Sequence, residues 1–167
     1  EKDGALEVNC RGGKKVVEAM QTAFGRRILK LPSMPRIPAK PVYDLDRLKE
    51  RNFPFVYGPE QGIEAVWVNR LRLASISRES DRVTFEADAD SDRQALYDLI
   101  RRVNMAIPMD RWRVLQASLS ARLAATDEKQ SRIERFNVSS PDSTNLKHDE
   151  VGVKLRAMLA ASGIEVK

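Results

Sequence analysis

Arginine is the residue type whose arrangement most clearly suggests a chemistry. Many arginines between positions 70 and 135 lie two residues apart or within short β-rich runs, and the candidates are Arg70, Arg72, Arg111, Arg113, Arg122, Arg132 and Arg135. Side chains two residues apart on a strand share one face, and guanidinium groups bind phosphate oxygens through paired hydrogen bonds. The pattern predicts a basic sheet face that contacts nucleic acid through its phosphates and reads little sequence.

The alternative interpretation is that these arginines are ordinary surface residues. The chain has 29 Lys and Arg against 24 Asp and Glu, a formal net charge of +5, so most guanidinium groups have a carboxylate available. Trp67 and Trp112 could stack on bases, but tryptophan is more often found in the core. A second hypothesis for the function is therefore a protein-interaction or self-assembly module of a larger cytoplasmic protein, which docks through the sheet face or a proline-rich segment.

A second candidate for phosphate binding is the turn that contains Gly12, Gly13, Lys14 and Lys15. It joins an apolar run typical of a strand to a helical pattern, and backbone amides at the start of a helix can hold an anion. The phosphate-binding loop of nucleotide hydrolases needs Gly, four residues, then Gly-Lys-Ser/Thr, and this chain lacks both the spacing and the hydroxyl residue. Nucleotide hydrolysis is not predicted, and a glycine turn with solvated lysines is the alternative.

Acidic residues near position 90 have a spacing similar to that of a calcium loop: Glu86, Asp88, Asp90 and Asp92. The similarity ends there, because Arg93 stands where that loop needs glycine and Leu99 stands where it needs glutamate. Pro141-Asp142 and Glu165-Val166-Lys167 can be aligned with the residue order of metal-dependent nucleases. A predicted helix separates the two pieces, which argues against such a site.

His148 is the only histidine, so a serine-based triad has a single candidate for its base. Four hydroxyl residues lie nearby in sequence, and turn or capping roles account for them: Ser139, Ser140, Ser143 and Thr144. We therefore predict no catalytic residue, no metal site and no cofactor. A metal-dependent, nuclease-like enzyme stays the third hypothesis for the function.

Length and composition restrict the class of protein. The chain has 167 residues, of which 42% are hydrophobic, enough for the core of one domain. Cys10 is the only cysteine, which excludes an intrachain disulfide and a thiolate zinc site, so we expect a protein of the reducing cytoplasm. No apolar run reaches the roughly 20 residues that span a bilayer, and no membrane contact is expected. The sequence starts at Glu1 rather than Met, which suggests a piece of a longer protein.

The first 62 residues are expected to form two segments. Residues 1–31 predict a strand-helix element, with a strand from Ala5 to Val8 and a helix marked by an apolar stripe from Val17 to Leu31. Residues 32–62 predict a proline-rich linker or strap, because closely spaced prolines favour extended backbone. A short helical turn is expected near residues 44–50.

Residues 63–167 carry the pattern of an antiparallel sheet with two helices. The expected strands are 66–76, with a bulge between Val68 and Leu71, then 82–87, 115–123 and 132–138. Segment 115–123 also fits a helix, and a loose repeat of the 70–75 run at 120–125 favours the strand. The expected helices are 93–103, capped by Asp92, and 149–161, ended by Gly163.

The predicted fold class is α+β. Two strand–strand–helix units form one antiparallel sheet with helices on one face, and the strand-helix element and the proline-rich strap precede them. We expect the chain to form one compact domain overall.

Overall fold

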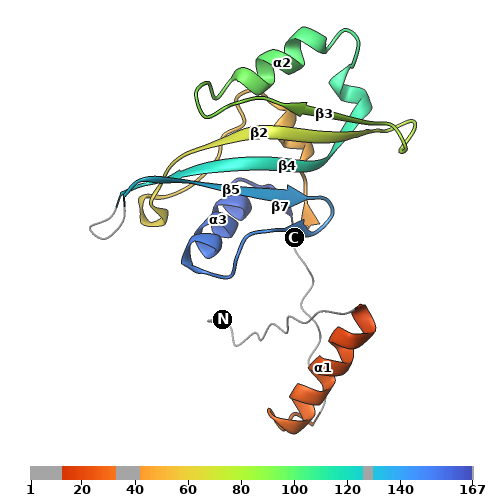
Figure 1. Ribbon diagram of the computed structural model, residues 1–167, viewed down its shortest axis with the longest axis vertical. Coiled ribbons are helices and arrows are strands. Elements are labelled where there is room, and N and C mark those ends of the chain that lie inside the picture. The colour runs from red at the N-terminus through yellow and green to blue at the C-terminus, as the bar shows by residue number, and fades with distance from the viewer. Residues whose placement is uncertain (1–12, 33–41, 126–129, 167) are drawn as a thin grey trace. The chain divides into compact units, whose positions relative to one another are not determined.

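The computed structural model describes residues 13–32, 42–125 and 130–166, and the side chain of Lys14 is not described. The described part is a mixed α+β structure with three α-helices, a two-stranded sheet and a five-stranded sheet, both antiparallel (Figure 1). The chain divides into two compact units, Glu1–Ala39 and Lys40–Lys167. The predicted α+β class with antiparallel strands is therefore confirmed.

The first unit contains helix α1 (Lys14–Arg27). Gly13 is its N-cap in an extended conformation, and Arg26 and Arg27 lie in the last turn, where cations interact favourably with the helix dipole. The predicted strand from Ala5 to Val8 and residues 33–41 of the predicted strap lie outside the described residues.

The second unit is built on the five-stranded sheet, whose strand order is β3-β2-β4-β5-β6. Its strands are β2 (Ile63–Ser75), β3 (Arg82–Glu86), β4 (Trp112–Leu123), β5 (Arg132–Ser139) and β6 (Ser143–Thr144). The pairing of β2 with β4 shifts register between Val68 and Arg70, which confirms the predicted bulge. The ambiguous segment 115–123 is a strand, because Ala117, Leu119 and Ala121 alternate into the core between β2 and β5.

One hydrophobic core joins a single face of this sheet to two helices, α2 (Ala95–Val103) and α3 (Glu150–Ala161). The strands contribute buried leucines such as Leu71 and Leu119, while Leu96 of α2 and Leu155 of α3 are fully buried against them. These helices form because apolar residues recur at helical spacing and cover the apolar side of the sheet.

The ends of the two helices test the capping predictions. The Asp149 side chain accepts a hydrogen bond from the Gly152 amide at 2.8 Å, and Gly163 after α3 has φ of +68°, as the predicted cap and stop require. Helix α2 begins at Ala95 with Gln94 as its N-cap, so the prediction that Asp92 caps it was wrong. Asp92 instead accepts the Gln94 amide in a turn that precedes the helix, at 2.9 Å.

From Val42 on, the segment for which a linker or strap was predicted packs with the sheet unit. Strand β1 (Val42–Tyr43) pairs with β7 (Glu165–Val166), and a 3₁₀ helix follows at Asp46–Lys49. Leu45 and Leu48 are buried in the same core as the sheet residues, and the Leu48 carbonyl accepts the Tyr97 hydroxyl at 3.1 Å.

Candidate functional site

The sheet face opposite the core, here called the outer face, carries most of the predicted arginines. Residues directly opposite each other on neighbouring antiparallel strands point to the same face. The register therefore sets two rows across β3, β2, β4 and β5 of the sheet. The first row is Glu86, Arg70, Ser118 and Asn137, and the second is Thr84, Arg72, Gln116 and Ser139.

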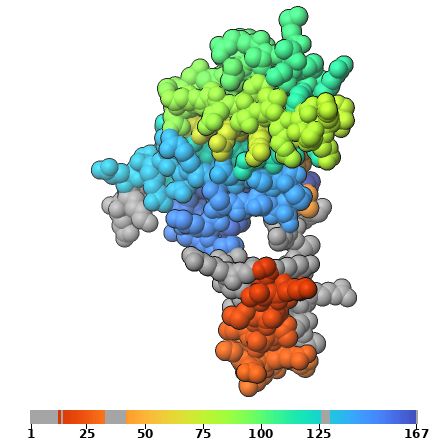
Figure 2. All heavy atoms as spheres, turned by 45° about the vertical axis from the view of Figure 1, so that its right-hand side comes forward, coloured from red at the N-terminus to blue at the C-terminus, as the bar shows by residue number. Residues whose placement is uncertain are grey.

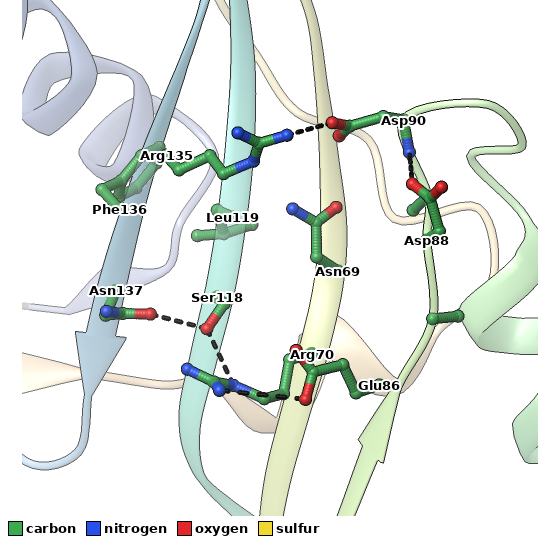
Figure 3. Close-up of a pocket in the computed structure, with 12 residues that line it drawn as sticks. Asn69, Arg70, Glu86, Asp88, Asp90, Ser118, Leu119, Arg135, Phe136 and Asn137 are labelled. Atoms are coloured by element: carbon green, nitrogen blue, oxygen red, sulfur yellow. Dashed lines mark hydrogen bonds and ion pairs between the residues drawn. The ribbon is translucent and has the colours of Figure 1, made fainter.

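Arg70 lies across the first row and is held by its neighbours (Figure 3). Its Nε donates to Ser118 Oγ at 3.1 Å, and its Nη1 lies 3.9 Å from Glu86 Oε2. The Ser118 hydroxyl donates in turn to Asn137 Oδ1 at 2.6 Å. Arg70 therefore has a fixed direction and a partly compensated charge.

One end of the outer face is closed by the loop between β3 and α2. The Asp90 carboxylate of this loop forms an ion pair with Arg135 of β5 and accepts a hydrogen bond from Trp67 Nε1 at 3.2 Å. The guanidinium groups of Arg93 and Arg122 lie over the indole ring, at 5.2 and 5.8 Å from a ring centroid. Trp67 is only 3% exposed as a result, so its ring is not available to stack on a base.

The other end of the outer face is open and arginine-rich. Ala74 of β2 lies opposite Arg82 of β3 and Arg113 of β4, and Arg72 is two residues away on the same face. We call Arg72, Arg82 and Arg113 the arginine end. It adjoins the exposed turn between β2 and β3, residues 76–81, drawn in yellow-green in Figure 2.

The charges of the arginine end differ in how far they are compensated. Arg113 forms an ion pair of 2.6 Å with Glu79 of the turn. Arg72 and Arg82 are exposed, and neither forms an ion pair or a side-chain hydrogen bond with any residue that the structure describes. Two guanidinium groups on one face are therefore available to an anion.

Between the two ends lies a shallow cavity of about 370 Å³, lined by side chains of both charges, among them Arg70, Asp88, Asp90 and Arg135. Asn69 also lines it, and its Nδ2 donates to Ser120 Oγ at 2.6 Å. Its Oδ1 is buried and accepts no hydrogen bond from the described residues. The cavity is suited to a polar group that can donate as well as accept hydrogen bonds.

The structure brings together five of the seven predicted arginines. Arg70, Arg72, Arg113, Arg122 and Arg135 share the outer face.

The other two predicted arginines lie elsewhere. Arg132 is opposite the buried Leu123, so it lies on the other face, and Arg111 ends a 3₁₀ helix before β4. Arg82 was missed by sequence reasoning, although its alternation with the apolar Val83 and Phe85 could have placed it on the polar side of a hairpin.

The glycine-lysine turn belongs to the first unit. Gly13 caps α1, Lys15 is exposed in its first turn, and that turn holds no acidic residue. Gly12 and the side chain of Lys14 lie outside the described residues.

The residues of the nuclease-like alignment are separated by strand β1. Tyr43 of β1 donates its amide to the carbonyl of Pro141 on one side at 2.7 Å and pairs with Glu165 on the other. Burial raises the pKa of the Tyr43 hydroxyl, and the carboxylates of Glu165 and Asp142 add to this effect. No group of three or more His, Cys, Asp or Glu within residues 13–32, 42–125 and 130–166 is arranged to hold a metal ion, and Lys167 is not described.

Comparisons with protein-family models, curated proteins and solved structures found no match for this chain. Among the helices of the described residues, none is both long and apolar enough to cross a membrane.

Proposed function

We propose that the outer face of the sheet binds nucleic acid, and that the arginine end makes the main contacts with phosphate groups. The observation that carries the proposal is the position of Arg72 and Arg82. Both are exposed on one face of adjacent strands, and neither is paired with a carboxylate in the described residues. A phosphate that meets such a pair gains charge-assisted hydrogen bonds and displaces no existing ion pair.

The second row of the outer face supports the same proposal of phosphate binding. Thr84, Gln116 and Ser139 are uncharged polar residues that flank Arg72 across the sheet. Hydroxyl and amide side chains are common contacts to phosphate and sugar oxygens. They add hydrogen bonds to the backbone of a nucleic acid without adding repulsion.

The closed end of the outer face offers, among the described residues, no aromatic ring that could recognise a base. Trp67 is covered by Arg93, Arg122 and the loop that carries Asp90, so it offers no ring for a base. We therefore expect binding that depends on phosphates, falls steeply with salt and shows little preference for sequence.

A charge reversal on each face tests the proposal. Arg72→Glu removes a cation from the outer face, and Arg132→Glu makes the same change in net charge on the other face. Binding of fluorescently labelled single-stranded DNA, duplex DNA and RNA to the full chain is measured by anisotropy over a range of salt concentrations. Arg72→Glu should weaken binding roughly tenfold and reduce the salt slope by about one, while Arg132→Glu should bind like the unmodified chain.

Two results would overturn the proposal. One is the absence of binding to all three nucleic acids at low salt. The other is an equal loss of affinity in Arg72→Glu and Arg132→Glu, because that would show a general effect of net charge and no role for the outer face.

The two predicted strand–strand–helix units, with the loose repeat of residues 70–75 at 120–125, are kept as part of the same proposal. The element order β2, β3, α2 and then β4, β5, α3 fits two strand–strand–helix units with β2 and β4 side by side. In the repeat, Arg122 corresponds to Arg72, and both lie on the outer face next to core leucines, Leu123 and Leu73. The two units would then each contribute one arginine before their hairpin turn.

A further inference from the structure

Strand β3 is the outermost strand at one side of the five-stranded sheet, so one side of its backbone faces no other strand (Figure 1). The Ser75 amide donates to the Asp81 carbonyl at 3.1 Å, and the Ala87 amide donates to the Asn69 carbonyl at 3.1 Å. Antiparallel pairs alternate between hydrogen-bonded and non-hydrogen-bonded positions. The backbone groups of residues 81, 83, 85 and 87 therefore point to β2, and those of 82, 84 and 86 point to the free edge.

The free edge carries three residues with unpaired backbone groups. Arg82, Thr84 and Glu86 are all exposed, and their amides and carbonyls form no hydrogen bond with other described residues beyond the β2–β3 ladder. An open edge of this kind can accept another strand.

The sequence of β3, Arg-Val-Thr-Phe-Glu, is complementary to itself when read in the opposite direction. If two copies pair in antiparallel fashion around Thr84, Arg82 of one copy faces Glu86 of the other, and this ion pair occurs twice. The same register places Val83 opposite Phe85 of the second copy, on the side of the sheet that faces the core. Opposite charges and apolar pairs in these positions stabilise strand pairing.

The hydrogen-bonding pattern fits this register. The facing pairs 82 with 86, 84 with 84 and 86 with 82 are those whose amides and carbonyls point outward, so each pair can exchange both of its N–H···O bonds. A shift by one residue would place inward-pointing groups opposite outward-pointing ones. A shift by two residues would keep the bonds but would break the match of charges.

We infer that β3 is a self-association edge, through which two copies of this chain form a symmetric dimer with one continuous antiparallel sheet. The contact is isologous, because each copy supplies the same residues to it. The two-fold axis runs through the sheet at Thr84, so both outer faces lie on the same side, and the arginine end of each copy lies beside Glu86 of the other. The contact needs no nucleic acid. In the dimer Arg82 is paired with Glu86 of the second copy, and Arg72 is the cation of the arginine end that stays available to phosphate.

Charge reversal at the two ends of β3 tests the inference. Arg82→Glu places glutamate opposite Glu86 of the second copy, and Glu86→Arg places arginine opposite Arg82. Each variant alone should raise the dissociation constant of the dimer roughly tenfold or more, because two attractive pairs become repulsive. In an equimolar mixture of the two variants every pair is again complementary, so a heterodimer should form with an affinity near that of the unmodified chain.

The measurement is sedimentation equilibrium of the full chain over a range of concentrations, without nucleic acid, with circular dichroism to check that each variant is folded. Arg132→Glu, a charge reversal outside β3, is the matched control and should dimerise normally. The inference is overturned if the unmodified chain is a monomer at the highest concentration reached. It is also overturned if the single variants dimerise as well as the unmodified chain, or if their mixture gives no heterodimer.

Discussion

Replacing Asp90 tests how the loop over Trp67 is held. One carboxylate oxygen of Asp90 accepts the Trp67 indole N–H at 3.2 Å, and the other is paired with Arg135. Asp90→Ala removes both contacts, whereas Asp90→Asn keeps an oxygen that can accept the indole hydrogen bond and loses only the ion pair. The two variants therefore separate the hydrogen bond from the charge.

The burial of the two partners of Asp90 sets the expected loss in the free energy of unfolding. Trp67 is 3% exposed, so in Asp90→Ala its N–H loses its acceptor in a place that water does not reach freely, at a cost of about 1–3 kcal/mol. The Arg135 side chain is 64% exposed, so its ion pair contributes at most about 1 kcal/mol. We expect Asp90→Ala to lower the free energy of unfolding by about 2–3 kcal/mol and Asp90→Asn by less than about 1 kcal/mol.

The assay is equilibrium unfolding in urea, followed by circular dichroism and by tryptophan emission. The chain has two tryptophans, so a Trp112→Phe background makes Trp67 the only source of tryptophan emission. In that background Asp90→Ala should shift the native emission to longer wavelength, because the indole becomes more accessible to water. The reasoning is refuted if the alanine and asparagine variants are equally unstable, or if both stay within about 0.5 kcal/mol of the unmodified chain.

The remaining predictions concern three positions in the helices of the sheet unit. Tyr97→Phe leaves the Leu48 carbonyl without its hydroxyl donor, so urea unfolding should show a loss of about 1–2 kcal/mol. Burial raises the pKa of Tyr97 above its usual 10.0, so as the pH rises this hydroxyl ionises in the unfolded chain before it does in the folded one. The free energy of unfolding of the unmodified chain should therefore fall above pH 10 by more than that of Tyr97→Phe. Asp149→Ala removes the cap of α3 and should cost about 1 kcal/mol in the same assay, with Asp149→Asn nearly neutral. Gly152→Ala would push a methyl group onto the backbone carbonyl of Lys147, and a thermal melt should show a loss of about 1–3 kcal/mol.

The strands and the last helix could be predicted because their signals are local. The alternation of Arg82, Val83, Thr84 and Phe85 indicates a half-buried strand without any knowledge of its neighbours. The cap of α3 is equally local, since the Asp149 side chain reaches an amide only three residues away.

The membership of the outer face depended on contacts between distant segments. Arg132 and Arg135 lie three residues apart, so the alternation of a strand places them on opposite faces. Only the register of β5 against β4 shows which face is the outer one, because it places Arg132 opposite the buried Leu123 and Arg135 opposite Ser120. The closing of the Trp67 end depends on Asp90, which lies 23 residues away in sequence. The alternation along a strand reports neither which face is the outer one nor the contact between Asp90 and Trp67.

The helix cap at Asp92 was mispredicted for a different reason. An aspartate before a helical pattern can accept an amide within a turn as well as at an N-cap, and both roles use the same residue type. Here Asp92 lies in a turn that precedes the helix along the chain, and the helix begins three residues later, at Ala95. The sequence identified the right kind of hydrogen bond and placed the start of the helix too early.

The pairing of β1 with β7 determines how the sheet unit would respond to a pulling force. Val42 lies opposite Val166, and Tyr43 lies opposite Glu165, so the backbone enters and leaves this unit at neighbouring points. Tension applied at positions 42 and 166 would load the rungs of this short ladder one after another, as in a zipper, and would reach the leucine-rich interior only after they had opened. We expect the β1–β7 pair to separate first, at low force, while β2 and β4 keep their pairing.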